Sequence, residues 1–117
     1  MLRFSICDSN KENLETLYTM LFDALTANKT PFLITKYDNY KEALNHCDNH
    51  VVYDIIFIAV DGEDSEGMKL ARYIRTYDSH CKIVITSAVK DYAYASYGIR
   101  AFNYILQPYN AQEVKAL

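Results

Sequence analysis

Hydrophobic residues in this chain occur either in short continuous runs or at the spacing of a helix. Five runs have the length of a strand, at residues 3–7, 32–35, 54–60, 81–86 and 101–106. The run at 54–60 is apolar at almost every position and rich in β-branched residues, which is typical of a strand buried on both faces. Strands that alternate with helices favour a parallel sheet with right-handed crossovers. The pattern therefore predicts an α/β fold.

The predicted helices between these runs are marked by apolar spacing and by polar residues at their starts. In the first helix, apolar residues that recur every three or four positions predict one buried stripe: Leu14, Leu17, Tyr18, Leu21, Phe22 and Leu25. Ser9 and Glu12 have the spacing of a capping box, which makes Ser9 the predicted N-cap. Two later helices have two candidate starting residues each, Asp38 or Asn39 and Ser65 or Glu66. Further helices are predicted at residues 91–98 and 111–117.

Composition narrows the classes of function. The 117 residues fit one domain, and the formal net charge is −3, with 12 basic and 15 acidic residues mixed along the chain. Since no Lys/Arg cluster exists, direct contact with nucleic acid is not expected from this segment. No apolar run approaches the ~20 residues that a membrane span needs. The three cysteines lack metal-type spacing, which favours reduced thiols in the cytoplasm.

Candidate chemistry lies where the predicted strands end. In open α/β sheets, ligands bind just beyond the carboxyl ends of the strands. Asp8 follows the first run, Ala59 stands near the end of the third, and Ser87 follows the fourth. An acidic loop with two glycines, residues 61–67, comes after Ala59. The working site is therefore predicted around residues 59–64.

Several short motifs follow one another along the chain from residue 53 onward. They are Tyr53-Asp54-Ile55-Ile56-Phe57, Gly67 eight residues past Ala59, Ser87-Ala88, Asp91-Tyr92-Ala93, and the segment 101–109. Together they resemble the receiver domain of two-component response regulators, and segment 101–109 resembles receivers attached to LytTR-type DNA-binding domains. The resemblance implies one CheY-like (flavodoxin-like) receiver domain over residues 1–117. It also implies a five-stranded parallel sheet in the order 2-1-3-4-5 with helices on both faces. We expect the last helix to be truncated and an output domain to follow.

The chain departs from the family at the positions that carry its chemistry. The family's phosphoacceptor aspartate falls on Ala59, its lysine before proline on Gln107, and its second acid after strand one on Ser9. A methyl group cannot act as a nucleophile, and an uncharged amide cannot replace an ammonium. The resemblance leaves Asp8 and Asp61 as a weak Mg²⁺ site that we expect to be empty. We therefore predict no catalytic residue, no resident cofactor and no enzymatic activity.

The resulting hypothesis is an atypical receiver, a pseudo-receiver that acts as a phosphorylation-independent dimerisation module in the cytoplasm. The resemblance assigns switch positions to Ser87, Tyr104 and Gln107. The face formed by helix 91–98, strand 101–106 and the last helix carries the expected dimer contacts: Tyr92, Tyr94, Tyr97, Tyr104 and Tyr109. The expected partners are a second copy and a sensor kinase or other regulatory protein, with no membrane contact. DNA would be bound only by the output domain.

Three alternatives stay open. A loop acid such as Asp61 could accept the phosphoryl group in a Mg²⁺-dependent reaction. Ala59 could instead be an engineered replacement in an ordinary receiver. A third alternative is a small-molecule sensor, which predicts a closed apolar cavity near Asp8, Ala59 and Ser87. A flavodoxin-like cofactor protein is disfavoured, because no phosphate-binding loop follows the first strand.

Overall fold

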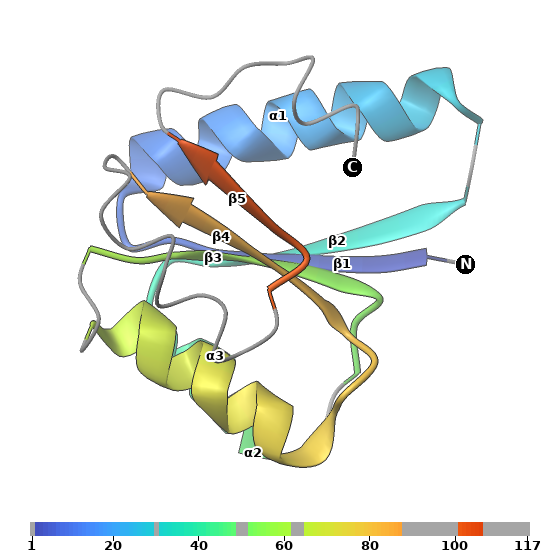
Figure 1. Ribbon diagram of the computed structural model, residues 1–117. Coiled ribbons are helices and arrows are strands. Elements are labelled where there is room, and N and C mark those ends of the chain that lie inside the picture. Colours follow the sequence, from blue (N-terminus) through green and yellow to red (C-terminus); the bar gives the residue numbers. More distant parts are fainter. Residues whose placement is uncertain (1, 30, 49–51, 62–64, 88–100, 107–117) are drawn as a thin grey trace.

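The computed structural model describes residues 2–29, 31–48, 52–61, 65–87 and 101–106. In chain order its elements are β1 (Leu2–Cys7), α1 (Lys11–Ala27), β2 (Phe32–Tyr37), α2 (Tyr40–Asp48), β3 (Ile55–Ala59), α3 (Glu66–Tyr77), β4 (Lys82–Ser87) and β5 (Asn103–Leu106). The strands form one parallel sheet in the order β2-β1-β3-β4-β5. Helix α1 covers one face of this sheet, and α2 and α3 lie on the other (Figure 1). The predicted parallel α/β fold is confirmed, whereas the predicted helices at 91–98 and 111–117 lie outside the described residues.

Strand β3 is buried on both faces, as its composition predicts. Phe57 is 1% exposed and belongs to the cluster under α1, which also holds Leu17 and Val84. Its neighbours Ile56 and Ile58 belong to the cluster under α2 and α3. Full burial of each such side chain contributes about 1.5–3 kcal/mol to stability. The centre of the sheet is therefore the part of the fold that the apolar pattern specifies most strongly.

Asp54 fixes the start of β3 at the opposite end from the candidate site. Its backbone N–H donates to the Arg3 carbonyl at 2.8 Å, and its carboxylate accepts the Arg3 N–H at 2.8 Å. Its carbonyl accepts the Lys82 N–H at 3.0 Å. One residue thus joins the beginnings of β1, β3 and β4, which sets the register of all three strands.

Helix α1 begins one residue later than the capping-box pattern predicts. The Asn10 side chain accepts the Asn13 N–H at 3.1 Å, so Asn10 is the N-cap and the assignment to Ser9 is wrong. Asparagine and serine are equally good caps, because each side chain offers an oxygen that can accept a backbone N–H of the first helical turn. The helix ends at Ala27 with Asn28 as its C-cap, and Lys29 turns the chain with a φ of 57°.

The buried stripe of α1 is narrower than predicted. Leu14, Leu17 and Leu21 are buried, and Ala24 joins them. Phe22 is 42% exposed, so its assignment to the buried stripe is wrong. Its ring packs edge-on against Phe32 with centroids 5.4 Å apart, at the outer strand of the sheet. The sheet ends at β2, and part of the Phe22 ring therefore stays in contact with water.

The starts of α2 and α3 follow the sequence prediction. Asn39 accepts the Glu42 N–H at 2.7 Å, and Ser65 accepts the Met68 N–H at 3.3 Å. Both side chains satisfy a backbone donor that the first helical turn leaves without a partner. Both helices therefore begin at the carboxyl edge of the sheet, beside the candidate site. Within the described ranges, no helix has the length and apolarity that crossing a membrane requires.

A hydrogen-bonded group of side chains ties α2 to the sheet. The buried Tyr37 hydroxyl at the end of β2 lies within hydrogen-bond distance of both His46 Nδ1 and the Tyr53 hydroxyl. The Tyr37 and His46 rings also meet edge to face, with centroids 5.2 Å apart. Because Tyr53 stands just before β3, this group joins β2, α2 and the approach to the central strand.

Candidate functional site

The register of the parallel strands brings three predicted site residues to one edge of the sheet. Cys7 pairs with Ile58 and Ala59 pairs with Thr86. Asp8, Ala59 and Ser87 therefore end adjacent strands side by side. All three are buried, with exposed fractions of 4%, 8% and 2%. The predicted site is thus assembled by strand register, from residues that are far apart in the sequence.

Asp8 is a buried carboxylate with one unsatisfied oxygen. Its Oδ1 accepts the Asn10 N–H at 2.9 Å, while its Oδ2 has no hydrogen-bond partner among the described residues. Burial raises the pKa of Asp8, and the hydrogen bond from Asn10 opposes that shift. The same hydrogen bond fixes the loop between β1 and α1. Asp8 therefore has a structural role, and its second oxygen remains available for a ligand.

Ala59 presents a methyl group where β3 ends, and its carbonyl is held by two neighbours. The Tyr40 hydroxyl donates to the Ala59 carbonyl oxygen at 2.8 Å. Gly67 packs against the same peptide: a Cβ atom at position 67 would overlap that oxygen and lie 3.1 Å from the carbonyl carbon. Glycine at position 67 is thus needed because α3 begins in direct contact with the end of β3.

Tyr40 is a site residue that the sequence analysis missed. Burial is the largest cause that raises the pKa of its phenol, and electrostatic interactions with Cys7, Asp8 and Asp61 add to it. A hydrogen bond with the Ser9 side chain acts in the opposite direction. The hydroxyl therefore stays protonated and donates to Ala59. Its one sequence signal is its place directly after the Asn39 cap, which puts it at the carboxyl edge of the sheet.

A polar hollow of about 450 Å³ opens above these residues. The described residues that line it are Ser9, Asn39, Tyr40, Asp61, Ser65, Glu66 and Gly67. Asp61 is exposed there, whereas Asp8, Ala59 and Ser87 are buried and are not among the lining residues. The hollow is open and polar, so its described walls do not match the closed apolar cavity that the small-molecule alternative predicts.

The described donors do not amount to a strong magnesium site. Mg²⁺ requires near-octahedral coordination by oxygen atoms. Among the residues that the structure describes, no group of three or more His, Cys, Asp or Glu side chains could hold a metal ion. Among the described acids, Asp8 follows β1, and Asp61 and Glu66 line the polar hollow. The resemblance places the family's second acid after strand one on Ser9 and its acceptor aspartate on Ala59. We therefore derive no chemistry through a bound cation.

Tyr104 lies in β5, paired in register with Ile85. Its side chain is not among those described. The other predicted switch and dimer residues lie outside the described residues: Gln107, Tyr92, Tyr94, Tyr97 and Tyr109.

The fold and the edge site define a class of protein, the parallel α/β domain with helices on both faces of its sheet (Figure 1) and candidate site residues at the carboxyl ends of its strands. A family model described as the response regulator receiver domain matches residues 5–117. The chain therefore belongs to the response regulator receiver family, which confirms the resemblance to CheY-like receivers.

Solved structures agree on the fold. The response regulatory domain of protein mrkE from Klebsiella pneumoniae has a TM-score of 0.82 and 22% identity, over 98% of this chain and 90% of that one. The response regulator TrrA from Thermotoga maritima, solved with Mg²⁺ and BeF, has a TM-score of 0.80 and 23% identity, over 99% and 95%. A two-component response regulator from Clostridium difficile has a TM-score of 0.79 and 23% identity, over 99% and 91%. No curated protein matches the chain.

Proposed function

We propose that this receiver domain is a pseudo-receiver, which acts without phosphorylation as an interaction module in two-component-type signalling. One observation carries the proposal: the acceptor position holds the buried methyl group of Ala59, and Tyr40 is hydrogen-bonded to its carbonyl. A phosphoryl acceptor needs a nucleophilic side-chain atom, which alanine lacks. In this proposal the domain is not an enzyme, and it has neither a catalytic residue nor a resident cofactor.

In the proposed mode of action, the domain forms a homodimer in the cytoplasm and sets the dimeric state of a LytTR-type DNA-binding output domain. The sheet order supports this arrangement, since β5 is the outermost strand on its side of the sheet. Five tyrosines stand in β5 and in the sequence on either side of it, and tyrosine is enriched at protein interfaces. A sensor kinase or another regulatory protein would control the domain by binding at this edge of the sheet, and phosphorylation would not be needed.

The test is the intact mass of the protein after incubation with acetyl phosphate and Mg²⁺ at neutral pH. We expect no added mass, and we expect light scattering of the same sample to report a dimer. The gain of one phosphoryl group, lost when the protein is denatured at alkaline pH, would overturn the proposal. If the mass is unchanged but the protein is a monomer, the proposal that the domain acts without phosphorylation stands. The proposal that it dimerises is then overturned.

A second candidate function is phosphorylation on Asp61. One observation favours it: Asp61 is exposed, lines the polar hollow with Ser9, and lies close enough to Tyr40 to contribute to the raised pKa of the phenol. This candidate predicts a phosphoryl adduct that Asp61→Asn abolishes. The matched control is Asp23→Asn, which removes an exposed carboxylate on α1 and should leave labelling unchanged.

A further inference from the structure

Strand β2 is the outermost strand of the sheet on the side away from β5. In the described part of the chain it pairs with β1 alone, in register from Phe32 to Tyr37. The free side of an outermost strand carries a row of backbone N–H and C=O groups, which can pair with a strand of another chain. Charged side chains along the strand usually prevent such pairing. The one charged residue of β2 is Lys36, and its ammonium is held against α1 by Glu15 at 2.9 Å.

The hydrogen bonds to β1 show which backbone groups of β2 face outward. The Pro31 carbonyl accepts the Leu2 N–H, and the Tyr37 carbonyl accepts the Asp8 N–H, both at 3.1 Å. Because the backbone groups of successive strand residues point to alternate sides, the odd-numbered residues of β2 face β1. The even-numbered residues therefore direct their N–H and C=O groups toward the free side of the strand: Phe32, Ile34 and Lys36.

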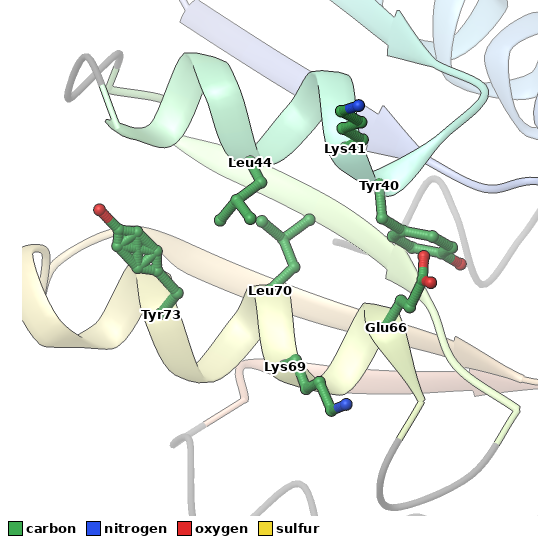
Figure 2. A pocket seen from close by; sticks show the side chains of 7 residues that line it. All are labelled: Tyr40, Lys41, Leu44, Glu66, Lys69, Leu70 and Tyr73. Atoms are coloured by element: carbon green, nitrogen blue, oxygen red, sulfur yellow. The ribbon is translucent and has the colours of Figure 1, made fainter.

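Apolar side chains flank this free side on both faces of the sheet. On the α1 face, Phe22 is 42% exposed and packs edge-on against Phe32. Since Phe32 belongs to the cluster under α1, its neighbour Leu33 points to the opposite face. There α2 packs toward α3, with Leu44 and Leu70 pointing toward each other (Figure 2). Leu33 is left 49% exposed. A strand placed along β2 would remove apolar surface from water on both faces, which favours association.

A second copy of this chain matches the free side of β2 through a two-fold axis at Ile34. In antiparallel pairing, two residues directly opposite each other exchange both of their backbone hydrogen bonds. An axis at Ile34 places Ile34 opposite itself and Phe32 opposite Lys36 of the second copy. Each outward-facing residue of β2 then has a partner for its N–H and its C=O. Parallel pairing in the same register would instead bring Lys36 beside Lys36 of the second copy, and like charges at neighbouring positions are unfavourable.

We propose that two copies of this domain pair antiparallel along β2, with the two-fold axis at Ile34, and form one continuous sheet. The same surface patch serves both copies, which is the commonest symmetry of homo-oligomers. On the face opposite α1, Leu33 of each copy lies opposite Thr35 of the other. The β2 interface is at the other edge of the sheet from β5, and it does not rest on the dimer proposed there.

The test is amide hydrogen exchange of the ¹⁵N-labelled domain over a series of protein concentrations that ends at about 1 mM. The amides of Phe32, Ile34 and Lys36 should exchange rapidly in dilute protein and more slowly as the concentration rises. At a concentration about ten times the dissociation constant, their exchange should be slowed by about tenfold. The amides of Leu33 and Thr35 face β1 and should exchange slowly at every concentration.

A proline substitution tests the position of the axis. Ile34→Pro removes the central outward N–H and leaves the hydrogen bonds to β1 in place, because proline is tolerated where the N–H of an edge strand faces solvent. This variant should lose the concentration dependence at Phe32 and Lys36, and light scattering should report a lower mass than for wild type. Ile34→Val is the matched control, since it keeps the N–H and the β-branched side chain and should behave as wild type. Dispersed amide spectra show that each variant is folded.

Two results would overturn the β2 interface. One is rapid exchange of the Phe32, Ile34 and Lys36 amides at every concentration. The other is a concentration dependence that Ile34→Pro leaves unchanged. If light scattering reports a dimer in which these three amides exchange rapidly, the β2 interface is wrong and the homodimer under the proposed function stands. None of these results bears on phosphorylation, which the intact-mass experiment decides separately.

Discussion

Gly67→Ala tests whether the packing of α3 against the end of β3 is as tight as the geometry indicates. The added Cβ would overlap the Ala59 carbonyl oxygen and lie 3.2 Å from Ile58 Cγ2. Both neighbours are buried parts of the central strand, so relief requires a shift of the backbone. Overpacking of this kind costs about 1–3 kcal/mol. Alanine's better helix propensity offsets at most about 1 kcal/mol, and less in the first turn.

The expected net loss is about 1–2 kcal/mol, which lowers the Tm of a domain of this size by roughly 4–8 °C. Urea and thermal denaturation, followed by circular dichroism, measure it. Arg72→Ala is the matched control, because it introduces alanine at an exposed position of the same helix and should stay within about 0.5 kcal/mol of wild type. If Gly67→Ala is as stable as Arg72→Ala, the inferred contact between α3 and Ala59 does not exist.

A double-mutant cycle then asks whether Gly67 and Tyr40 act on the same carbonyl. Tyr40→Phe removes only the hydroxyl that donates to Ala59 at 2.8 Å and should cost about 0.5–1.5 kcal/mol. Since Gly67→Ala displaces that carbonyl, Tyr40→Phe should cost less in its presence, with a coupling of about 0.5 kcal/mol or more. Strict additivity of the two changes would refute a shared contact.

Three further predictions concern the same edge of the sheet. Asp8→Asn should stabilise the domain at neutral pH in EDTA. Because burial raises the pKa of the Asp8 carboxyl, the wild-type domain loses stability as the pH rises through the folded-state pKa. The stability advantage of the asparagine variant should therefore shrink toward acid pH. Asn10→Ala should cost about 1 kcal/mol in urea denaturation, whereas Ser9→Ala should cost less, because Asn10 is the N-cap. Ala59→Asp places a second carboxylate beside Asp8, so Mg²⁺ should raise its Tm by more than that of wild type.

Each of these predictions has an outcome that contradicts it. An Asp8→Asn advantage that is equal at acid and neutral pH would show that the Asp8 charge is not the cause. A larger loss for Ser9→Ala than for Asn10→Ala would restore the capping-box assignment. An equal response of wild type and Ala59→Asp to Mg²⁺ would show that the two carboxylates do not share a cation.

The sequence predicts helices and strands where the deciding residues are neighbours in the chain. It predicts the edge site because the position of that site follows from the parallel pairing of the strands. Asn39 and Ser65 stand directly before helical apolar spacing, and each caps its helix. The convergence of Asp8, Ala59 and Ser87 follows from parallel pairing, since strands that run in one direction end at one edge.

The parts that sequence reasoning missed depend on a one-residue choice or on a distant contact. Ser9 and Asn10 are both good caps, and spacing alone does not separate them. The role of Tyr40 rests on a hydrogen bond between residues 19 positions apart, formed only when the turn after β2 carries the ring across the end of β3. Neither the spacing of hydrophobic residues nor the pattern of capping residues in the sequence predicts such a contact.

The Tyr37 hydroxyl between His46 and Tyr53 links the direction of proton donation across three elements. Tyr37 has one hydroxyl hydrogen, so it cannot donate to both neighbours at once. When His46 Nδ1 carries no proton, Tyr37 donates to it and the Tyr53 hydroxyl donates to Tyr37. When Nδ1 is protonated, it donates to Tyr37, and the Tyr37 hydrogen can then point toward Tyr53. The tautomer of a half-buried ring on α2 thus decides which way a hydroxyl points at the entrance to the central strand.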